Sequence, residues 1–410
     1  MPGPGFEWIG KEEEDEVLDV LRSRWLFRYG DEKNPAFKHK VKTLEEMVEQ
    51  KFNTRHALAV TSGTAALITA LSALGIGPGD EVIVPGYTFI ASISSIIIAR
   101  AVPVLAEVDE SLTLDAGDVE RKITPRTKAI MAVHMLGNPC DLERLRVIAG
   151  KYNVVLIEDA AQAFGASYRG KRVGTIGKMG IYSFNIFKTI NAGDGGMVVT
   201  DDDVLYSRAF GYHDQGHLPS RIGAEIGNRS IIGQNYRMNE LTGAVLIAQF
   251  RKIDIITERL RYLKNRLKKN IEGLGDLAFR TINDPAGESN TLLTVFFPSK
   301  EIAEQVAGKL DTTTVSKSGW HVYSNMEQVL GKQMITGHGC PYKCPSYPCK
   351  QEYRRGMLPR TDHLLERAIN LSVGVVDRGL GAGFGVNPLS TDEEVDRKAD
   401  EFIAAVKEYL

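Results

Sequence analysis

Short runs of β-branched and other apolar residues alternate with helical patterns through the first half of the chain. Patterns with the helical period, such as TAALITALSALG (64–75) and DLERLRVIAGKY (141–152), separate several of these runs. Strand–helix alternation of this kind predicts an α/β fold with a mainly parallel sheet sandwiched by helices. The runs expected to be buried strands are HALAV (56–60), EVIVP (81–85), PVLAEV (103–108), KAIMAVH (128–134) and NVVLIED (153–159).

A longer helical pattern begins the second half. From Leu246, apolar residues recur every three or four positions as far as Ile271, which predicts one long helix. We place a domain boundary inside it. The chain then divides into a large domain of residues 1–250, with an N-terminal helical segment, and a smaller C-terminal α/β domain of residues 251–410. A last amphipathic helix is expected from residue 390 to the end.

The composition excludes several classes of protein. The 410 residues are 43% hydrophobic and 25% charged, as in ordinary soluble proteins, and a net charge of −2 gives no sign of nucleic-acid binding. The most apolar window, residues 89–99, is too short to span a bilayer. Four cysteines do not make a disulfide framework in so long a chain. We therefore expect a cytoplasmic protein without a membrane or nucleic-acid partner.

Polar and aromatic residues follow three of the predicted strands, at the edge of a parallel sheet where ligands bind. In TSGTAAL (61–67), Gly63 and Thr64 open a helix whose N–H groups suit a phosphate, although such helix starts are commonplace. VVLIEDAAQAFGA (154–166) carries Glu158 and Asp159. Such acids either cap a following helix or place a carboxylate beside a cationic ring nitrogen. In PGYTFIAS (85–92), an aromatic ring either packs in the core or stacks on a flat cofactor.

Lys188 lies in an apolar setting within YSFNIFKTINAGDGGMVVT (182–200). Such a lysine either extends its ammonium to water or is desolvated, so that its pKa falls and the neutral amine can form a Schiff base. A phosphate-binding turn, an acid for a ring nitrogen, a stacking aromatic and this lysine are the groups that pyridoxal 5′-phosphate requires. Their occurrence together predicts that cofactor.

Four blocks carry a resemblance to a known family: SGTAAL, EDAAQAFGA, YSFNIFKT with GDGGMVVT, and GQNYRMNELTGA. They resemble the signatures of the DegT/DnrJ/EryC1/StrS aminotransferases, fold-type I pyridoxal-phosphate enzymes that aminate sugar and cyclitol ketones. The resemblance implies an aminotransferase that moves an amino group from glutamate or glutamine to a keto or aldehyde sugar, sugar acid or cyclitol. Such reactions serve amino-sugar, natural-product or surface-glycan biosynthesis. The resemblance also implies a homodimer whose subunits share the two active sites.

The resemblance implies a role for each matched residue. Lys188 corresponds to the Schiff-base lysine and Asp159 to the partner of the pyridine nitrogen, and both would be catalytic. Gln162 corresponds to the residue beside the cofactor's phenolic oxygen. Phe89 corresponds to the stacking aromatic. The implied phosphate contacts are Gly63, Thr64, Ser183 and, from the neighbouring subunit, Asn235, with Arg237 close by.

Two residues depart from the family pattern, one in a turn and one near the implied substrate side. Asp194 stands where a glutamate is expected and Gln215 where a histidine is expected. The segment GWHVYSN (319–325) is similar to one in the subgroup that aminates an eight-carbon sugar acid, the 8-amino-3,8-dideoxy-octulosonate transaminases. That similarity makes His321 and Tyr323 candidate substrate contacts. Tyr87, which lies just after a predicted strand in residues 85–92, is a third candidate. Core or interface packing is the ordinary role of such residues.

HGCPYKCPSYPC (338–349) gathers three cysteines and a histidine. The spacing Cys-x3-Cys-x4-Cys is not that of a standard zinc finger, and prolines stiffen the segment. We therefore expect a surface or substrate-rim loop and no metal. Arg354, Arg355 and Arg360 follow as candidate anion contacts or solvated charges.

Two other functions remain open at this point. One is a pyridoxal-phosphate sugar dehydratase, and the other is a non-catalytic relative that acts as a sensor or scaffold. Relatives that dehydrate carry a histidine at the lysine position, and a scaffold does not need the lysine. Lys188 therefore weighs against both.

Overall fold

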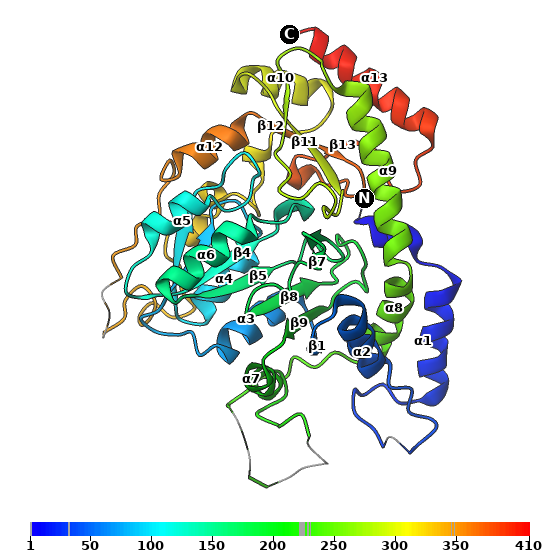
Figure 1. The fold of residues 1–410 in the computed structure, drawn as a ribbon, viewed down its shortest axis with the longest axis vertical. Coiled ribbons are helices and arrows are strands. Elements are labelled where there is room, and N and C mark those ends of the chain that lie inside the picture. Colours follow the sequence, from blue (N-terminus) through cyan, green and yellow to red (C-terminus); the bar gives the residue numbers. More distant parts are fainter. Residues whose placement is uncertain are drawn as a thin grey trace.

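Seven apolar segments of the first half form one sheet in the computed structural model, which describes residues 2–31, 33–220, 226–227, 229, 231–345, 347 and 349–410. The order is β1-β9-β8-β5-β4-β2-β3 (Figure 1). Neighbours from β8 to β3 are parallel, whereas β9 runs antiparallel to both β8 and β1. The strands are β1 (His56–Val60), β2 (Glu81–Pro85), β3 (Val102–Ala106), β4 (Thr127–Val133), β5 (Val155–Asp159), β8 (Met179–Ser183) and β9 (Gly196–Thr200). The predicted α/β fold with a mainly parallel sheet is confirmed.

Both faces of this sheet are buried, as its continuous apolar strands require. Alternate residues of β1 point to opposite sides: Ala57 and Ala59 join one core cluster, and Leu58 and Val60 join the other. The helices of this part of the chain are α1 (Lys11–Ser23), α2 (Lys40–Phe52), α3 (Gly63–Ala73), α4 (Ile90–Ile98), α5 (Ala116–Lys122), α6 (Leu142–Tyr152), α7 (Asp203–His213) and α8 (Glu240–Arg251).

A second, four-stranded sheet of order β10-β11-β12-β13 lies beyond the carboxyl ends of the first (Figure 1). Its strands are β10 (Ala278–Phe279), β11 (Leu292–Phe296), β12 (Ala368–Ser372) and β13 (Phe384–Gly385). Its helices are α9 (Ile253–Ile271), α10 (Lys300–Lys309), α12 (Pro359–Glu366) and α13 (Asp392–Lys407). The last of these starts with a capping box between Thr391 and Glu394.

The single long helix predicted from Leu246 to Ile271 is wrong, because the helix is interrupted at Lys252 between α8 and α9. Lys252 instead donates its ammonium to the carbonyl of Trp8 and pairs with Glu13. The apolar period continues across the break since Phe250 and Ile253 both pack in the same core cluster. The domain boundary near residue 250 stays a prediction.

Among the residues that the structure describes, none of the helices has the length and apolarity that a membrane span requires.

Candidate active site

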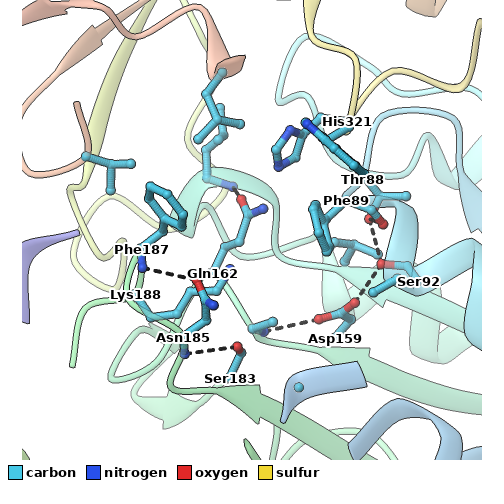
Figure 2. Close-up of a pocket in the computed structure, with 18 of the residues that line it drawn as sticks. Thr88, Phe89, Ser92, Asp159, Gln162, Ser183, Asn185, Phe187, Lys188 and His321 are labelled. Atoms are coloured by element: carbon cyan, nitrogen blue, oxygen red, sulfur yellow. Dashed lines mark hydrogen bonds between the residues drawn. The ribbon is translucent and has the colours of Figure 1, made fainter. Parts of the chain in front are cut away.

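A cavity of about 510 Å³ lies at the carboxyl ends of the large sheet, beneath the second sheet (Figure 2). The turns after β1, β2, β4, β5 and β8 all contribute to its wall. The predicted residues found there are Gly63, Thr64, Phe89, Asp159, Gln162, Ser183, Lys188 and His321. The structure thus brings together residues that lie up to 258 positions apart, between Gly63 and His321.

Lys188 sits in the turn between β8 and β9, with its side chain in the cavity. Phe184 and Ile190, on either side of it in the sequence, are fully buried. Desolvation lowers the pKa of Lys188 to about 8, while the negative charge of Asp159 opposes this shift. The neutral amine is therefore readily formed near physiological pH.

Asp159 ends β5 and is almost completely buried. Burial raises the pKa of its carboxyl group, and hydrogen bonds from Ser92 and the Ala161 N–H oppose that rise. Its neighbour Glu158 points to the other face of the sheet, where it accepts the N–H groups of Gly174 and Ile176. Residues 160–166 form turns, so no helix begins there for these acids to cap. The helix-cap alternative is wrong.

The start of α3 has the geometry of a phosphate-binding turn. Ser62 caps the helix by accepting the Ala65 N–H at 3.0 Å, which leaves the N–H groups of Gly63 and Thr64 without intrahelical acceptors. A Cβ at Gly63 would lie 2.7 Å from the Cβ of Ser183, so the helix end can approach that strand only with glycine there. The hydroxyl groups of Thr64 and Ser183 also line this end of the cavity.

Gln162 is fixed by a strained turn. Its Oε1 accepts the N–H of Leu136 at 2.9 Å, which leaves the amide NH₂ group for the cavity. Leu136 has a φ of 53°, a conformation that costs a non-glycine residue energy. Arg280, buried beside β10, donates to the carbonyls of Met135 and Leu136 and so supports this turn.

The structure places some of the predicted aromatic residues in the cavity and others in the core. Phe89 lines the cavity, 39% exposed, with its ring centroid 5.3 Å from that of His321. Burial and the charge of Lys188 lower the pKa of His321 to about 3, so its imidazole is neutral. Tyr87 and Tyr323 are fully buried in the core, and neither lines the cavity. The hydroxyl of Tyr323 donates to Asp362 at 2.9 Å. The structure does not support substrate contacts for these two tyrosines.

Asn235 lies outside the cavity of its own chain. It is exposed and pairs through its backbone with Asp214. Arg237 is bound to Asp214 and Gln215 beside it, and none of these residues lines the cavity. Of these residues Asn235 and Gln215 are exposed, whereas Asp214 is fully buried.

The cysteine-rich segment forms a surface loop away from the cavity, with Ser346 and Pro348 outside the described residues. Cys340 and Cys344 form a disulfide, and Cys349 is a free thiol. Within the described ranges, no group of three or more potential ligands is placed to hold a metal ion. The arginines that follow do not line the cavity, and Arg360 pairs with Glu110 and Asp115.

Several site residues had no clear signal in the sequence. Thr291 and Asp377 reach the cavity from the second sheet and its loops. The N-terminal segment also supports the lysine turn: the Gly3 N–H donates to the Ile186 carbonyl at 2.9 Å, and a Cβ at Gly3 would collide with Phe187. Such contacts join distant segments, and no local pattern predicts them.

The sequence matches the DegT/DnrJ/EryC1/StrS aminotransferase family over residues 7–375. The chain belongs to this family. A GDP-perosamine synthase of Escherichia coli O157:H7 is 40% identical over 266 residues, which cover 65% of this chain and 70% of that enzyme. The expected membership, aminotransferase activity and pyridoxal-phosphate cofactor are confirmed.

Solved structures agree in fold. A 3-amino-5-hydroxybenzoic acid synthase superposes with a TM-score of 0.79 at 26% identity, covering 98% of this chain and 97% of that one. The pyridoxal-phosphate form of a putative sugar aminotransferase of Streptococcus pneumoniae gives 0.79 at 21% identity, covering 100% and 98%. The cavity fits this cofactor, because it offers a phosphate turn, a buried acid and a desolvated lysine in one space.

Proposed function

We propose that this enzyme transfers an amino group from glutamate or glutamine to the carbonyl carbon of a nucleotide-linked keto sugar. The observation that carries the proposal is the placement of Lys188 and Asp159 in one cavity with the α3 phosphate turn. The likeness to a GDP-perosamine synthase favours a nucleotide-linked acceptor over a free sugar acid or a cyclitol. The sugar-acid subgroup suggested by residues 319–325 is thus the second candidate.

Each residue of the site has its own proposed role. Gly63, Thr64 and Ser183 would hold the cofactor's phosphate, Phe89 would stack on its ring, and Gln162 would donate to its phenolic oxygen. When bound, pyridoxal phosphate supplies a carbonyl that joins amino groups covalently and a ring that accepts an electron pair. The neutral amine of Lys188 then takes the α-proton of the amino donor and delivers a proton to the acceptor carbon. The carboxylate of Asp159 holds a proton on the ring nitrogen.

We also propose that the enzyme is a homodimer. Asn235 is exposed and does not line the cavity of its own chain, which supports the proposal that it completes the phosphate site of a second subunit in a homodimer. A cytoplasmic location is proposed with it, since the substrates are expected there.

Two alternatives compete with amination. A sugar dehydratase of this fold would use the same cofactor without Lys188 as the proton carrier, and a sensor or scaffold would not need a lysine of lowered pKa. The pKa of Lys188, lowered to about 8 by desolvation, favours an amine that reacts.

Mass spectrometry of the products tests this proposal. The enzyme is incubated with glutamate or glutamine and a panel of nucleotide-linked keto sugars, keto sugar acids and keto cyclitols. We expect one nucleotide-linked member to gain an amino group, and the Lys188→Ala enzyme to make none. Lys178→Ala, which changes an exposed lysine paired with Asp202, is the matched control and should retain full activity. Loss of water without amination, or product from Lys188→Ala, would contradict the proposal.

A further inference from the structure

Three polar side chains form a buried line that ends at the catalytic acid (Figure 2). The hydroxyls of Thr88 and Ser92 are 2.7 Å apart, and the hydroxyl of Ser92 is 2.7 Å from Oδ2 of Asp159. The three residues are 0%, 1% and 4% exposed. Water therefore has little access to the hydrogen bonds between these side chains.

The direction of these hydrogen bonds follows from the chemistry of the groups. An ionised carboxylate only accepts, so Ser92 donates its single hydroxyl proton to Asp159. Ser92 can then only accept from Thr88, and the line runs Thr88 to Ser92 to Asp159. Hydrogen bonds in series polarise one another, so each donation strengthens the next. The other oxygen of Asp159 accepts the Ala161 N–H at 3.1 Å.

Ser92 behaves differently from the other serines of α4. Ser94 and Ser95 donate to the carbonyls of Ala91 and Ser92 on their own helix, as serines within helices commonly do. Ser92 instead points across to β5, whose Asp159 lies 67 positions away. The hydroxyl of Ser92 therefore has a partner in the active site, whereas the hydroxyls of Ser94 and Ser95 bond only to backbone carbonyls of α4.

We propose that Ser92, with Thr88 behind it, is a positioning residue that keeps Asp159 ionised and aimed at the ring nitrogen of the cofactor. This inference rests on the proposed role of Asp159. Donors to a carboxylate favour its charged form, which burial disfavours, and a charged partner is what holds a proton on a pyridine nitrogen. Ser92 acts through its hydrogen bond to Asp159.

The test compares how the cofactor-free, full-length enzyme binds two ligands. One is pyridoxal 5′-phosphate, and the other is its 1-deaza analogue, in which a carbon replaces the ring nitrogen. In Ser92→Ala we expect affinity for pyridoxal phosphate to fall about tenfold, the usual loss for one hydrogen bond to a charged group. Affinity for the analogue should stay within about twofold, because no ring nitrogen is left for Asp159 to meet. Thr88→Val should show the same selectivity with a smaller loss.

Ser95→Ala is the matched control, since it removes a fully buried hydroxyl from the same helix, three positions after Ser92. It should change neither affinity. Equal losses for both ligands in Ser92→Ala would show a merely structural effect and overturn the proposal. The proposal is also overturned if Ser92→Ala changes neither affinity, as expected for Ser95→Ala, while Asp159→Asn loses the preference for pyridoxal phosphate over the analogue. If Asp159→Asn also keeps that preference, the assigned role of Asp159 is wrong and the inference falls with it.

Discussion

The side-chain oxygen of Gln162 accepts the backbone N–H of Leu136 at 2.9 Å, in a turn where Leu136 adopts a left-handed conformation. This contact decides which end of the amide meets the cofactor. The oxygen is held by the protein, and the NH₂ group is left to donate to a phenolic oxygen. The turn is therefore part of the active site, although Leu136 itself supplies only a backbone group there.

Gln162→Glu tests this orientation. A carboxylate can still accept the Leu136 N–H, but its second oxygen cannot donate into the cavity. We expect pyridoxal phosphate to bind about tenfold more weakly, with thermal stability unchanged. Gln162→Leu should weaken binding and also lower the unfolding free energy by about 1–2 kcal/mol, because the Leu136 N–H loses its acceptor. A Glu variant that binds the cofactor as tightly as the natural enzyme would contradict the assigned orientation.

The lowered pKa of Lys188 predicts a pH-dependent stability of the cofactor-free protein. Its pKa is about 8 in the folded chain, against 10.5 for an ordinary lysine. Between these values the unfolded chain binds more protons, so folding stability rises with pH in this window. From pH 7.5 to 9.5 the rise should be about 2 kcal/mol.

Lys188→Met removes this contribution. Chemical denaturation of both proteins across that pH range measures the difference, and other titrating groups cancel in the comparison. Parallel stability profiles for the two proteins would show that Lys188 is not desolvated in the folded state.

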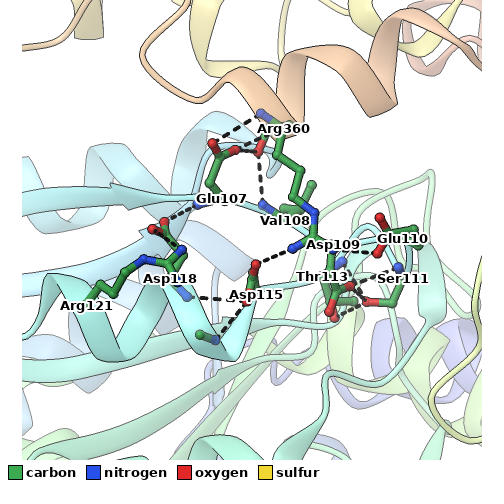
Figure 3. Close-up of polar contacts among 12 residues, drawn as sticks. Glu107, Val108, Asp109, Glu110, Ser111, Thr113, Asp115, Asp118, Arg121 and Arg360 are labelled. Atoms are coloured by element: carbon green, nitrogen blue, oxygen red, sulfur yellow. Dashed lines mark hydrogen bonds and ion pairs between the residues drawn. The ribbon is translucent and has the colours of Figure 1, made fainter.

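Glu107 caps the N-terminus of α12, although it is not part of that helix (Figure 3). Its carboxylate accepts the Arg360 N–H at 3.2 Å, the Thr361 N–H at 2.8 Å and the Thr361 hydroxyl at 2.6 Å. The helix starts with Pro359 and has no side-chain cap of its own. Glu107, which directly follows β3, therefore fastens this helix to the large sheet.

Glu107→Ala should lower the unfolding free energy by about 2 kcal/mol, since buried N–H groups of α12 lose a charged acceptor. Glu110→Ala is the control: its exposed pair with Arg360 should be worth less than about 0.5 kcal/mol. Denaturant titration measures both. Equal stabilities for the two variants would refute the capping role.

Local sequence patterns were sufficient to predict most of the helices and strands, and the site residues that adjoin strand ends. The apolar runs of β1 to β5 and the glycine at the start of α3 each have a local physical cause, so the sheet and the phosphate turn could be predicted. The break at Lys252 could not, because the helical period of apolar residues passes through it unchanged. The opposite orientations of Glu158 and Asp159 depend on the strand's alternation, which the sequence alone did not assign to a face.

Contacts between distant segments lay beyond local patterns. Ser92 looks like any small polar residue of an apolar helix until the order of β2, β4 and β5 brings it to Asp159. Phe89 and Tyr87 are two positions apart, yet the first lines the cavity and the second is core, since α4 begins directly after Phe89. The domain boundary near residue 250 and the role of Asn235 remain predictions.

Reduction of the yellow, cofactor-loaded enzyme with borohydride tests directly whether Lys188 holds pyridoxal phosphate. This treatment fixes pyridoxal phosphate to the amine that holds it, and mass spectrometry of a digest then locates the label. We predict one modified peptide, with the pyridoxyl group on Lys188, and no label in Lys188→Ala. A label on another lysine, such as the buried Lys264, or a loaded enzyme that gives no labelled peptide, would show that Lys188 is not the Schiff-base lysine.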